Sequence, residues 1–302
     1  MITHLLVPLD GSRLAESALP AAVYLASRLH ATITLLHVIE QDPPKTVHGE
    51  PHLGSEEEAV RYLDEVAGRE VFSALAVRSH VHTGKTDDVA KGILEHLDEF
   101  KPDLCVMCTH GRSGLRPLLF GTIAQKVAGS GTLPVMLIPP APSNAPPQPF
   151  ALTTILVPLD GAPDHEQGLP IASELALACG ASVHVLLVVP TLGTLSDHHA
   201  LTGLLLPGAT KAVLELSRQE GEAYLKRHVE GLVAAGIRGR AEICRGDPRK
   251  GIATTARRLR ADLIVLGTHG RLGMEAFWEG SLCAKISSRP TLPMLLVPRV
   301  PS

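Results

Sequence analysis

The seven residues LLVPLDG, at Leu5 to Gly11, recur as ILVPLDG at Ile155 to Gly161, 150 positions later. Each copy is an apolar run that ends in an acid and a glycine. This pattern is typical of a strand that is covered on both faces of a parallel sheet and then followed by a sharp turn. Repetition over so long a spacing indicates that a whole domain is duplicated, because solenoid repeats have much shorter periods.

A second pair of matching segments supports the duplication. DLCVMCTHGRSG begins at Asp103 and DLIVLGTHGRLG begins at Asp262, a spacing of 159, so the second copy has a net nine additional residues after its second strand. Between the copies, PPAPSNAPPQP (Pro139–Pro149) contains too many prolines for a helix or a central strand. We predict one domain at 1–140, a linker at 141–150 and a second domain at 151–302.

Short apolar runs alternate with helical segments in both copies, which predicts parallel strands joined by right-handed helical crossovers. In the first copy we expect strands at 3–9, 32–39, 77–82, 103–109 and 134–138, and helices at 13–29, 55–75, 87–99 and 121–129. The matching strands of the second copy are 154–159, 182–189, 239–244, 262–267 and 293–297. The chain is therefore predicted to be an α/β protein with two tandem, doubly wound domains.

Composition excludes several classes of protein. The net charge of −3 and the aromatic content of 3% argue against nucleic-acid binding. The five cysteines have no framework spacing, which indicates a reducing compartment. The N-terminus does not resemble a secretion signal, and the apolar runs are too short to insert into a membrane. We expect a cytoplasmic protein.

The loop after the fourth strand has the same glycine spacing in both copies. Glycines let backbone N–H groups approach an anion, and the last glycine opens a helix whose N-terminus favours a phosphate. A tight strand-to-helix turn without a ligand is the alternative. Asp10 and Asp160, at the ends of the first strands, either cap the next helix or accept a ribose hydroxyl. The spaced positions are Cys108, Gly111, Gly121 and Thr122 in the first copy and Gly267, Gly270, Gly280 and Ser281 in the second.

Together, the LDG strand ends, the THGRSG segment and the G-x2-G-x9-G-[ST] spacing resemble the universal stress protein family over both copies. The resemblance implies five parallel strands per domain in the order 3-2-1-4-5. In nucleotide-binding members it implies ATP, ADP or AMP, with Mg²⁺ as an optional companion. The implied site residues are Pro8, Leu9, Asp10, Val38, Cys108, Gly111, Gly121, Thr122 and Ile123, and then Pro158, Leu159, Asp160, Val188, Gly267, Gly270, Gly280, Ser281 and Leu282.

The two copies depart from this pattern in different ways. Cys108 replaces the first glycine of the first loop, whereas the second loop carries Glu275 and Glu279, which are unfavourable near a polyphosphate. We therefore expect a stress-response regulator with two unequal adenine-nucleotide sites. It lacks the phosphate loop and kinase motifs, so we expect no efficient enzyme. The alternatives are an interaction or dimerisation module that no longer binds nucleotide, and a slow ATPase.

A cysteine pair, a histidine pair and the last strands are three further features of the sequence. Cys105-x-x-Cys108 resembles a redox or zinc motif, although residues three apart on a strand face opposite sides and there is no second cysteine pair. His80 and His82 share one strand face and offer a metal site, although solvent-facing histidines are the more ordinary interpretation. The last strands, VMLIP and MLLVP, are expected to be sheet edges. We predict that they pair within the chain as a pseudo-dimer, with a homodimer as a further option.

Overall fold

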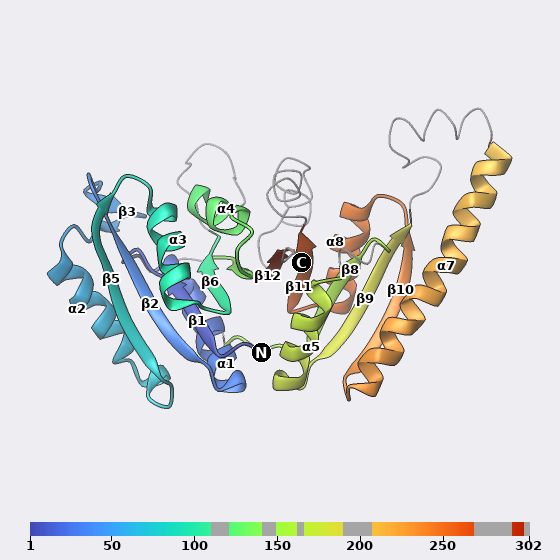
Figure 1. Cartoon of the computed structure of the whole chain (residues 1–302), viewed down its shortest axis with the longest axis horizontal. Helices are drawn as coiled ribbons and strands as arrows, with labels where there is room; N and C mark the ends of the chain where they lie inside the picture. The colour runs from blue at the N-terminus through green and yellow to red at the C-terminus, as the bar shows by residue number, and fades with distance from the viewer. Residues whose placement is uncertain (110–120, 141–148, 162–165, 190–206, 269–291, 299–302) are drawn as a thin grey trace.

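The computed structural model describes residues 1–109, 121–140, 149–161, 166–189, 207–268 and 292–298, which include a ten-stranded sheet with helices on both faces (Figure 1). The strands of the first copy are β1 (His4–Pro8), β2 (Thr32–Glu40), β5 (Val77–Thr86), β6 (Leu104–Cys108) and β7 (Val135–Ile138). Those of the second are β8 (Thr154–Leu159), β9 (Ser182–Val189), β10 (Arg238–Arg245), β11 (Leu263–Thr268) and β12 (Met294–Pro298).

The order of the strands is β10-β9-β8-β11-β12-β7-β6-β1-β2-β5. Within each copy every neighbouring pair is parallel. Counted along each copy, both halves therefore have the order 3-2-1-4-5. The predicted α/β class and the order implied by the family resemblance are both confirmed.

The two halves of the sheet join through their last strands. β12 pairs with β7 in the antiparallel sense, with Met294 opposite Leu137 and Leu295 opposite Met136. This is the pairing within the chain that the apolar last strands predicted. On one side of the sheet α1 (Leu19–Leu29) also contacts α5 (Gly168–Cys179), so the two copies share more than one pair of strands.

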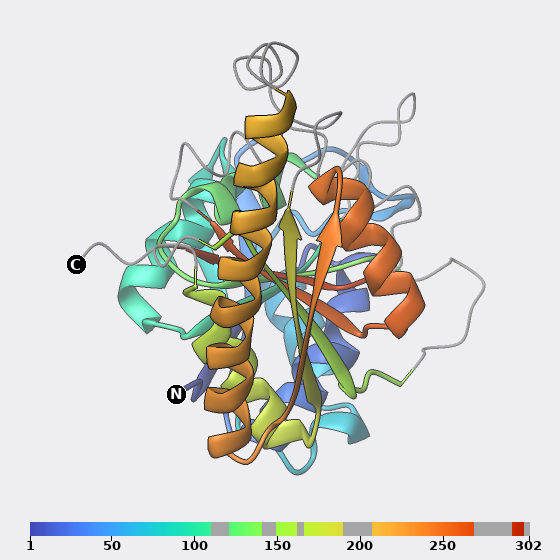
Figure 2. The ribbon, with the colours of Figure 1, turned by 90° about the vertical axis from the view of Figure 1, so that its right-hand side faces the viewer.

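The helices divide between the two faces. Cores on one face are built with α1, α2 (Glu56–Ala67), α5 and α7 (Pro207–Ala234), and on the other with α3 (Val89–Phe100), α4 (Thr122–Gly129) and α8 (Pro248–Leu259). Alternation along β1 explains the division, because Leu5 and Val7 join the first core and Leu6 joins the second. Figure 2 shows α7 running along β9 and β10.

Two α-helices are shorter than the sequence predicted, since one begins later and the other ends earlier. The expected helix at 13–29 is a 3₁₀ turn at Ala15–Ala18 followed by α1, because Pro20 is tolerated only in the first turn of an α-helix. The expected helix at 55–75 is α2, closed by Gly68, and then a 3₁₀ turn at Glu70–Phe72. No helix in the described residues is both long enough and apolar enough to cross a membrane.

The turn after the first strand of each copy depends on its glycine. Gly11 and Gly161 have φ values of +86° and +87°, which side chains other than glycine rarely adopt. The LDG repeat therefore encodes the same backbone turn after β1 and after β8.

A short hairpin, which the sequence did not predict, follows β2. β3 (Thr46–Val47) and β4 (Glu50–Pro51) are antiparallel and are joined by His48 and Gly49, with φ values of 52° and 88°. Two central residues with positive φ are the mark of a type I′ turn. Val47 and His48 of this hairpin form one side of a cavity at the carboxyl ends of the strands.

Candidate functional site

A cavity of about 280 Å³ lies at the carboxyl ends of β1, β2 and β6. The strand order reverses between β1 and β6, and such a point is where open parallel sheets bind ligands. The N-terminal turns of α3 and α4 and the β3–β4 hairpin also contribute to its walls.

The cavity gathers most of the residues that the family resemblance implied for the first copy. Of the implied residues, those that line the cavity are Pro8, Leu9, Asp10, Val38, Cys108, Thr122 and Ile123. Gly121 precedes α4, and its N–H donates to the Thr109 carbonyl at 2.7 Å, so this amide is already used within the protein. Gly111 lies outside the described residues.

Apolar side chains form the inner wall of the cavity. Leu36 and Val38 come from β2, Ile93 from α3 and Met107 from β6. Most ligand pockets combine such walls with a small number of placed polar groups. This part of the cavity is suited to a flat, apolar group such as a nucleobase.

Asp10 does not cap the following helix itself, because neither the 3₁₀ turn at Ala15–Ala18 nor α1 has a side-chain cap; it instead fixes Ser12 in the turn that precedes them. Its Oδ1 accepts hydrogen bonds from the Ser12 N–H at 2.9 Å and the Ser12 hydroxyl at 2.6 Å. Ser12 Oγ in turn accepts from the Ala15 N–H at 3.1 Å. The other carboxylate oxygen lies 3.6 Å from Nε2 of His48, and the Asp10 side chain is 40% exposed. The carboxylate is therefore held in place at the rim of the cavity.

His37 is a buried polar residue of the cavity that the sequence did not single out. Its Nδ1 lies 2.8 Å from the Leu9 carbonyl, and among the described residues its buried Nε2 has no hydrogen-bond partner. Desolvation lowers the pKa of His37, which favours a neutral ring that donates from Nδ1 and leaves Nε2 as an acceptor. An unpaired buried acceptor costs about 1–3 kcal/mol, which a donor on a ligand would offset.

Two more histidines come from the hairpin region and were also missed. Nε2 of the buried His52 lies 3.1 Å from a carboxylate oxygen of Glu40, and His48 faces Asp10. The sequence signal that could have found them is the His48-Gly49 dipeptide, since glycine favours the positive φ of a hairpin turn. Without knowledge of the hairpin, the sequence here has the composition of an ordinary loop.

The charges around the cavity are mostly acidic. The acidic lining residues are Asp10, Glu40, Asp87 and Asp88. Of the lysines and arginines in the described part of the chain, Lys126 lines the cavity. Lys126 Nζ lies 2.8 Å from Asp88 Oδ2, and this contact lowers the pKa of Asp88. Because Asp88 also caps α3, Lys126 is held near the N-terminus of that helix as well as on α4.

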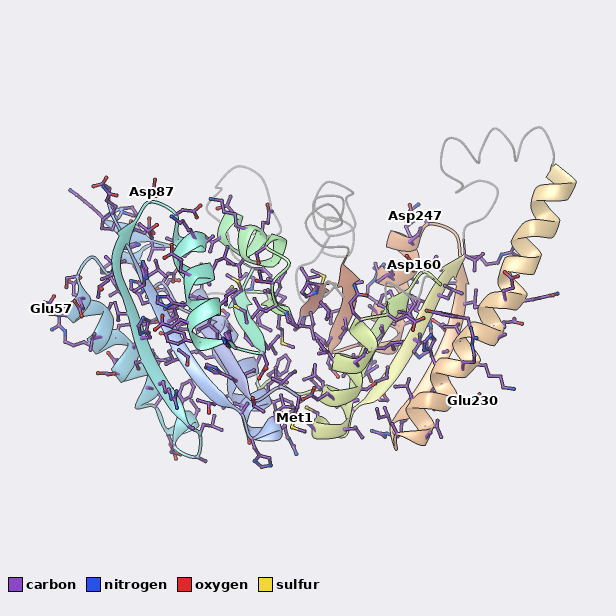
Figure 3. All side chains as sticks on the ribbon, viewed as in Figure 1. Met1, Glu57, Asp87, Asp160, Glu230 and Asp247 are labelled. Carbon is purple, nitrogen blue, oxygen red and sulfur yellow. The ribbon has the colours of Figure 1, made fainter. Side chains whose placement is uncertain are left out.

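The second copy presents the equivalent strand ends. Figure 3 shows Asp160 and Asp247, after β8 and β10, toward the same side of the molecule as Asp87, after β5. Leu159 is buried and Asp160 is exposed. Pro158, Val188 and Gly267 are partly buried at the ends of β8, β9 and β11. The remaining predicted residues, Gly270, Gly280, Ser281 and Leu282, lie outside the described residues.

The redox interpretation of Cys105 and Cys108 is not supported. Cys105 is buried in the core, where desolvation raises its pKa to about 12, and Cys108 lines the cavity. Neither thiol is joined in a disulfide. The pair contributes to packing and to the cavity wall, as the alternation of strand residues suggested.

Comparison with known proteins gives a consistent result. A family model described as the universal stress protein family matches residues 1–139 and again residues 152–298. The chain is 29% identical over 143 residues to the universal stress protein MJ0531 of Methanocaldococcus jannaschii, a match that covers 47% of this chain and 80% of the relative. It is 27% identical over 150 residues to the universal stress protein YxiE of Bacillus subtilis, covering 46% of this chain and 99% of that protein.

Two solved structures resemble the whole chain. One is a universal stress protein of Pseudomonas aeruginosa UCBPP-PA14, with a TM-score of 0.67, 16% identity and coverage of 98% of this chain and 93% of that one. The other is a universal stress protein of Archaeoglobus fulgidus DSM 4304, with a TM-score of 0.62, 18% identity and coverage of 98% and 96%. At these identities the likeness concerns the fold alone, and it extends over both copies.

Proposed function

Because this chain belongs to the universal stress protein family, with the family domain present twice, we propose that it binds an adenine nucleotide in the cavity of its first copy. The observation that carries the proposal is the cavity itself. It lies where the strand order reverses, and residues from β1, β2, β6 and α4 meet in it. We propose a regulatory role, in which occupancy of the cavity alters the surface formed by the hairpin and the nearby loops.

A nucleoside would match both the apolar and the polar lining residues of the cavity. The base would lie against Leu36, Val38 and Met107, and a ribose hydroxyl would donate to the Asp10 carboxylate that Ser12 fixes in place. The unpaired Nε2 of His37 offers an acceptor to a ligand N–H or O–H group. A volume near 280 Å³ lies just below the usual range of about 300–1,000 Å³ for ligand pockets, which suits a nucleoside better than a complete triphosphate.

The phosphates would lie toward the start of α4. Thr122 and Ile123 begin this helix and line the cavity, and free N–H groups of a first helical turn favour an anion. Among the described residues, four carboxylates and one lysine line the cavity, and these carboxylates oppose phosphate charge unless a cation accompanies it. We therefore expect Mg²⁺ to strengthen ATP binding much more than AMP binding.

We propose that the two sites are unequal and that the first binds more tightly. His37 follows Leu36, which pairs with Pro8, and Leu187 follows Leu186, which pairs with Pro158. Leu187 thus occupies the position of His37 in the second copy. The second copy lacks this buried acceptor, which is the most specific polar group of the first cavity.

Efficient hydrolysis is not part of the proposal. Asp10 is engaged by Ser12 and Glu40 by His52, so neither carboxylate is placed as an evident general base. We expect phosphate release to remain at a slow background and to be unchanged by Asp10→Ala at saturating ATP. Rapid release that Asp10→Ala abolishes would favour the ATPase alternative instead.

The direct test is release and rebinding of nucleotide. The purified chain is denatured and any released nucleotide is identified by chromatography. Thermal unfolding is then measured with ATP, ADP and AMP, with and without Mg²⁺. Ligand at 100 times its Kd should add about 2.7 kcal/mol to the free energy of unfolding.

Two variants locate the site. His37→Leu, which installs the residue of the second copy, should reduce the ligand-induced shift. His184→Leu removes a buried histidine from β9 and should leave the shift unchanged. If no adenine nucleotide is released and none stabilises the protein, the chain does not bind this ligand and the interaction-module alternative is favoured.

A further inference from the structure

A cluster of histidines lies between β5 and α3, separate from the cavity. His80 and His82 share the face of β5 that meets α3, because alternate residues of a strand point the same way. His96 and Glu99 lie one helical turn apart on α3. Figure 1 shows β5 and α3 side by side, and none of these four residues lines the nucleotide cavity.

The side chains of the cluster are close enough to share one ion. Nδ1 of His96 lies 2.7 Å from Oε2 of Glu99. One donor atom from each of His80, His96 and Glu99 lies within 4.8 Å of the others. Ligands of a tetrahedral zinc ion with bonds of about 2.0–2.1 Å lie roughly 3.3 Å apart. Small side-chain rotations, mostly of the exposed Glu99, would bring the three atoms to this separation.

The surroundings hold the imidazoles in fixed orientations. His96 is buried and stacks on Phe100, with ring centroids 5.1 Å apart and an interplanar angle of 7°. His80 meets both rings edge-on, with centroid separations of 4.5 Å to His96 and 4.9 Å to Phe100. The Glu99 side chain is 56% exposed, so an ion can reach the buried nitrogen from solvent.

We propose that His80, His96 and Glu99 form a binding site for a borderline divalent transition-metal ion such as Zn²⁺, with water completing the coordination. Two imidazole nitrogens and one carboxylate oxygen suit such ions, whereas Mg²⁺ and Ca²⁺ prefer all-oxygen sites. The ion would replace the proton that His96 Nδ1 and Glu99 share. Nε2 of His96 would then carry its hydrogen and donate it to Nδ1 of His82, which lies 2.9 Å away. His82 is therefore a positioning residue, in the way that second partners orient metal-binding histidines.

The second copy shows what the same place in the fold contains without a metal donor set. Leu36 pairs with His80 and Leu186 pairs with Glu242, so these two residues occupy equivalent positions. α3 and α8 have equal length and are 159 positions apart, which matches His96 with Thr255 and Glu99 with Arg258. There, Arg258 forms a hydrogen-bonded ion pair with Glu242, and Thr255 donates to Glu242 at 3.2 Å.

This comparison separates a metal site from ordinary packing. The fold accepts a polar cluster at this position, and the second copy closes it with an internal cation, the guanidinium of Arg258. In the first copy the acid is Glu99, which stands at the position of Arg258, and its carboxylate contacts the imidazole of His96. A bound divalent ion would supply the positive charge that Arg258 supplies in the second copy.

The experiment titrates Zn²⁺ alone into the full chain after trace metals are removed by chelation. Binding is followed by calorimetry and by the thermal midpoint, and Co²⁺ absorption reports the coordination geometry. We expect saturable Zn²⁺ binding with a raised midpoint and no shift with Mg²⁺. The His80→Glu/His96→Thr/Glu99→Arg triple variant installs the pattern of the second copy and should lose the tightest Zn²⁺ binding step. The His228→Gln control, on α7, should keep it.

Two smaller changes keep the test decisive if the triple variant folds poorly. Glu99→Gln, at an exposed position, should weaken Zn²⁺ binding at least tenfold while the circular dichroism spectrum is unchanged. His82→Phe should weaken it about 10- to 100-fold, with His82→Gln partly restoring it. The absence of Zn²⁺ binding by the unmodified chain would overturn the proposal, as would binding that is equally tight in the folded triple or Glu99→Gln variants.

Discussion

At the amino ends of the central strands, the two copies of the domain are nearly identical. Oδ2 of Asp103 accepts hydrogen bonds from Thr3 N at 2.7 Å, Thr3 Oγ1 at 2.9 Å and His4 N at 3.0 Å. In the second copy, Oδ2 of Asp262 accepts from Thr153 N at 2.8 Å, Thr153 Oγ1 at 2.6 Å and Thr154 N at 2.9 Å. One carboxylate per copy thus ties the first strand to the fourth.

Beneath the helices of the first core, the copies also agree. The Tyr62 hydroxyl donates to Glu16 at 3.0 Å and the Tyr224 hydroxyl donates to Glu166 at 2.7 Å. The additional partner of each glutamate differs, being Arg69 in the first copy and His228 in the second. The hydrogen bond from tyrosine to glutamate is the same in both copies, whereas the basic side chain beside the glutamate differs.

At the carboxyl ends and between β5 and α3, the copies diverge. His37 corresponds to Leu187, and the cluster of His80, His96 and Glu99 corresponds to Glu242, Thr255 and Arg258. These side chains are not required to form the sheet, because the second copy forms the same sheet without them. The difference therefore separates residues that serve the fold from residues available for binding.

The largest expected effect tests whether the copies form one cooperative unit. Leu6→Ala and Leu156→Ala remove fully buried side chains from equivalent strands and should each lower the free energy of unfolding by about 2–5 kcal/mol. Because β7 pairs with β12, urea unfolding followed by circular dichroism should show a single transition in both variants. Two separate transitions, each sensitive to only one variant, would contradict this.

The two LDG turns should respond unequally to the same substitution. Gly161→Ala places a side chain in the left-handed region, at a cost of about 1–2 kcal/mol. Gly11→Ala should cost more, because the new Cβ would lie 2.9 Å from the Leu53 side chain, whereas the nearest described contact at Gly161 is 4.0 Å away. Chemical denaturation measures both values, and adding Leu53→Ala to Gly11→Ala is the control that should bring them closer together.

The carboxylate anchors should respond equally. Asp103→Ala and Asp262→Ala each remove an acceptor of three hydrogen bonds, and we expect a loss of about 1–2 kcal/mol in each case, given their partial exposure. The losses should add in the double variant, since the two sites share no partner. Asp→Asn, which keeps one oxygen acceptor, should lose less. Markedly unequal losses of unfolding free energy would show that the hydrogen bonds of Asp103 and Asp262 do not contribute equally.

The smallest expected effect concerns pH. Burial lowers the pKa of His37 from its ordinary value of 6.5, so the unfolded chain binds this proton more readily than the folded one. The associated stability is present above about pH 6.5 and is lost as the pH falls through the folded pKa. His37→Leu should flatten the dependence of thermal stability on pH over this range. An unchanged slope would mean that His37 is not the neutral, buried group described above.

Much of the fold followed from the sequence because it depends on local patterns. The repeated LDG turns and the apolar strands predicted the sheet, and the family resemblance supplied its order. The nine-residue difference between the copies proved to be composite. The spacing of equivalent residues is 162 at β10, as for Val77 and Gly239, so twelve residues are gained before this strand and three are lost before α8.

The candidate sites were only partly predictable. His80 and His82 were visible as a pair on one strand face, but His96 and Glu99 were not, because their position opposite β5 depends on how α3 packs. His37 lies within an apolar strand. Its Nε2 can be recognised as an acceptor for a ligand only once the cavity beside it is known. Such contacts join elements that are distant in sequence, and no periodicity records them.

The antiparallel pairing of β7 with β12 has a consequence for how the molecule can change over time. If two separate identical chains met along this edge, every substitution would appear twice, once on each side of the symmetry axis. Here both sides are encoded in one polypeptide, so each substitution appears once. A change that benefits one half need not be tolerated by the other. The fused sheet thus keeps the mutual support of a symmetric pair while freeing each half to specialise.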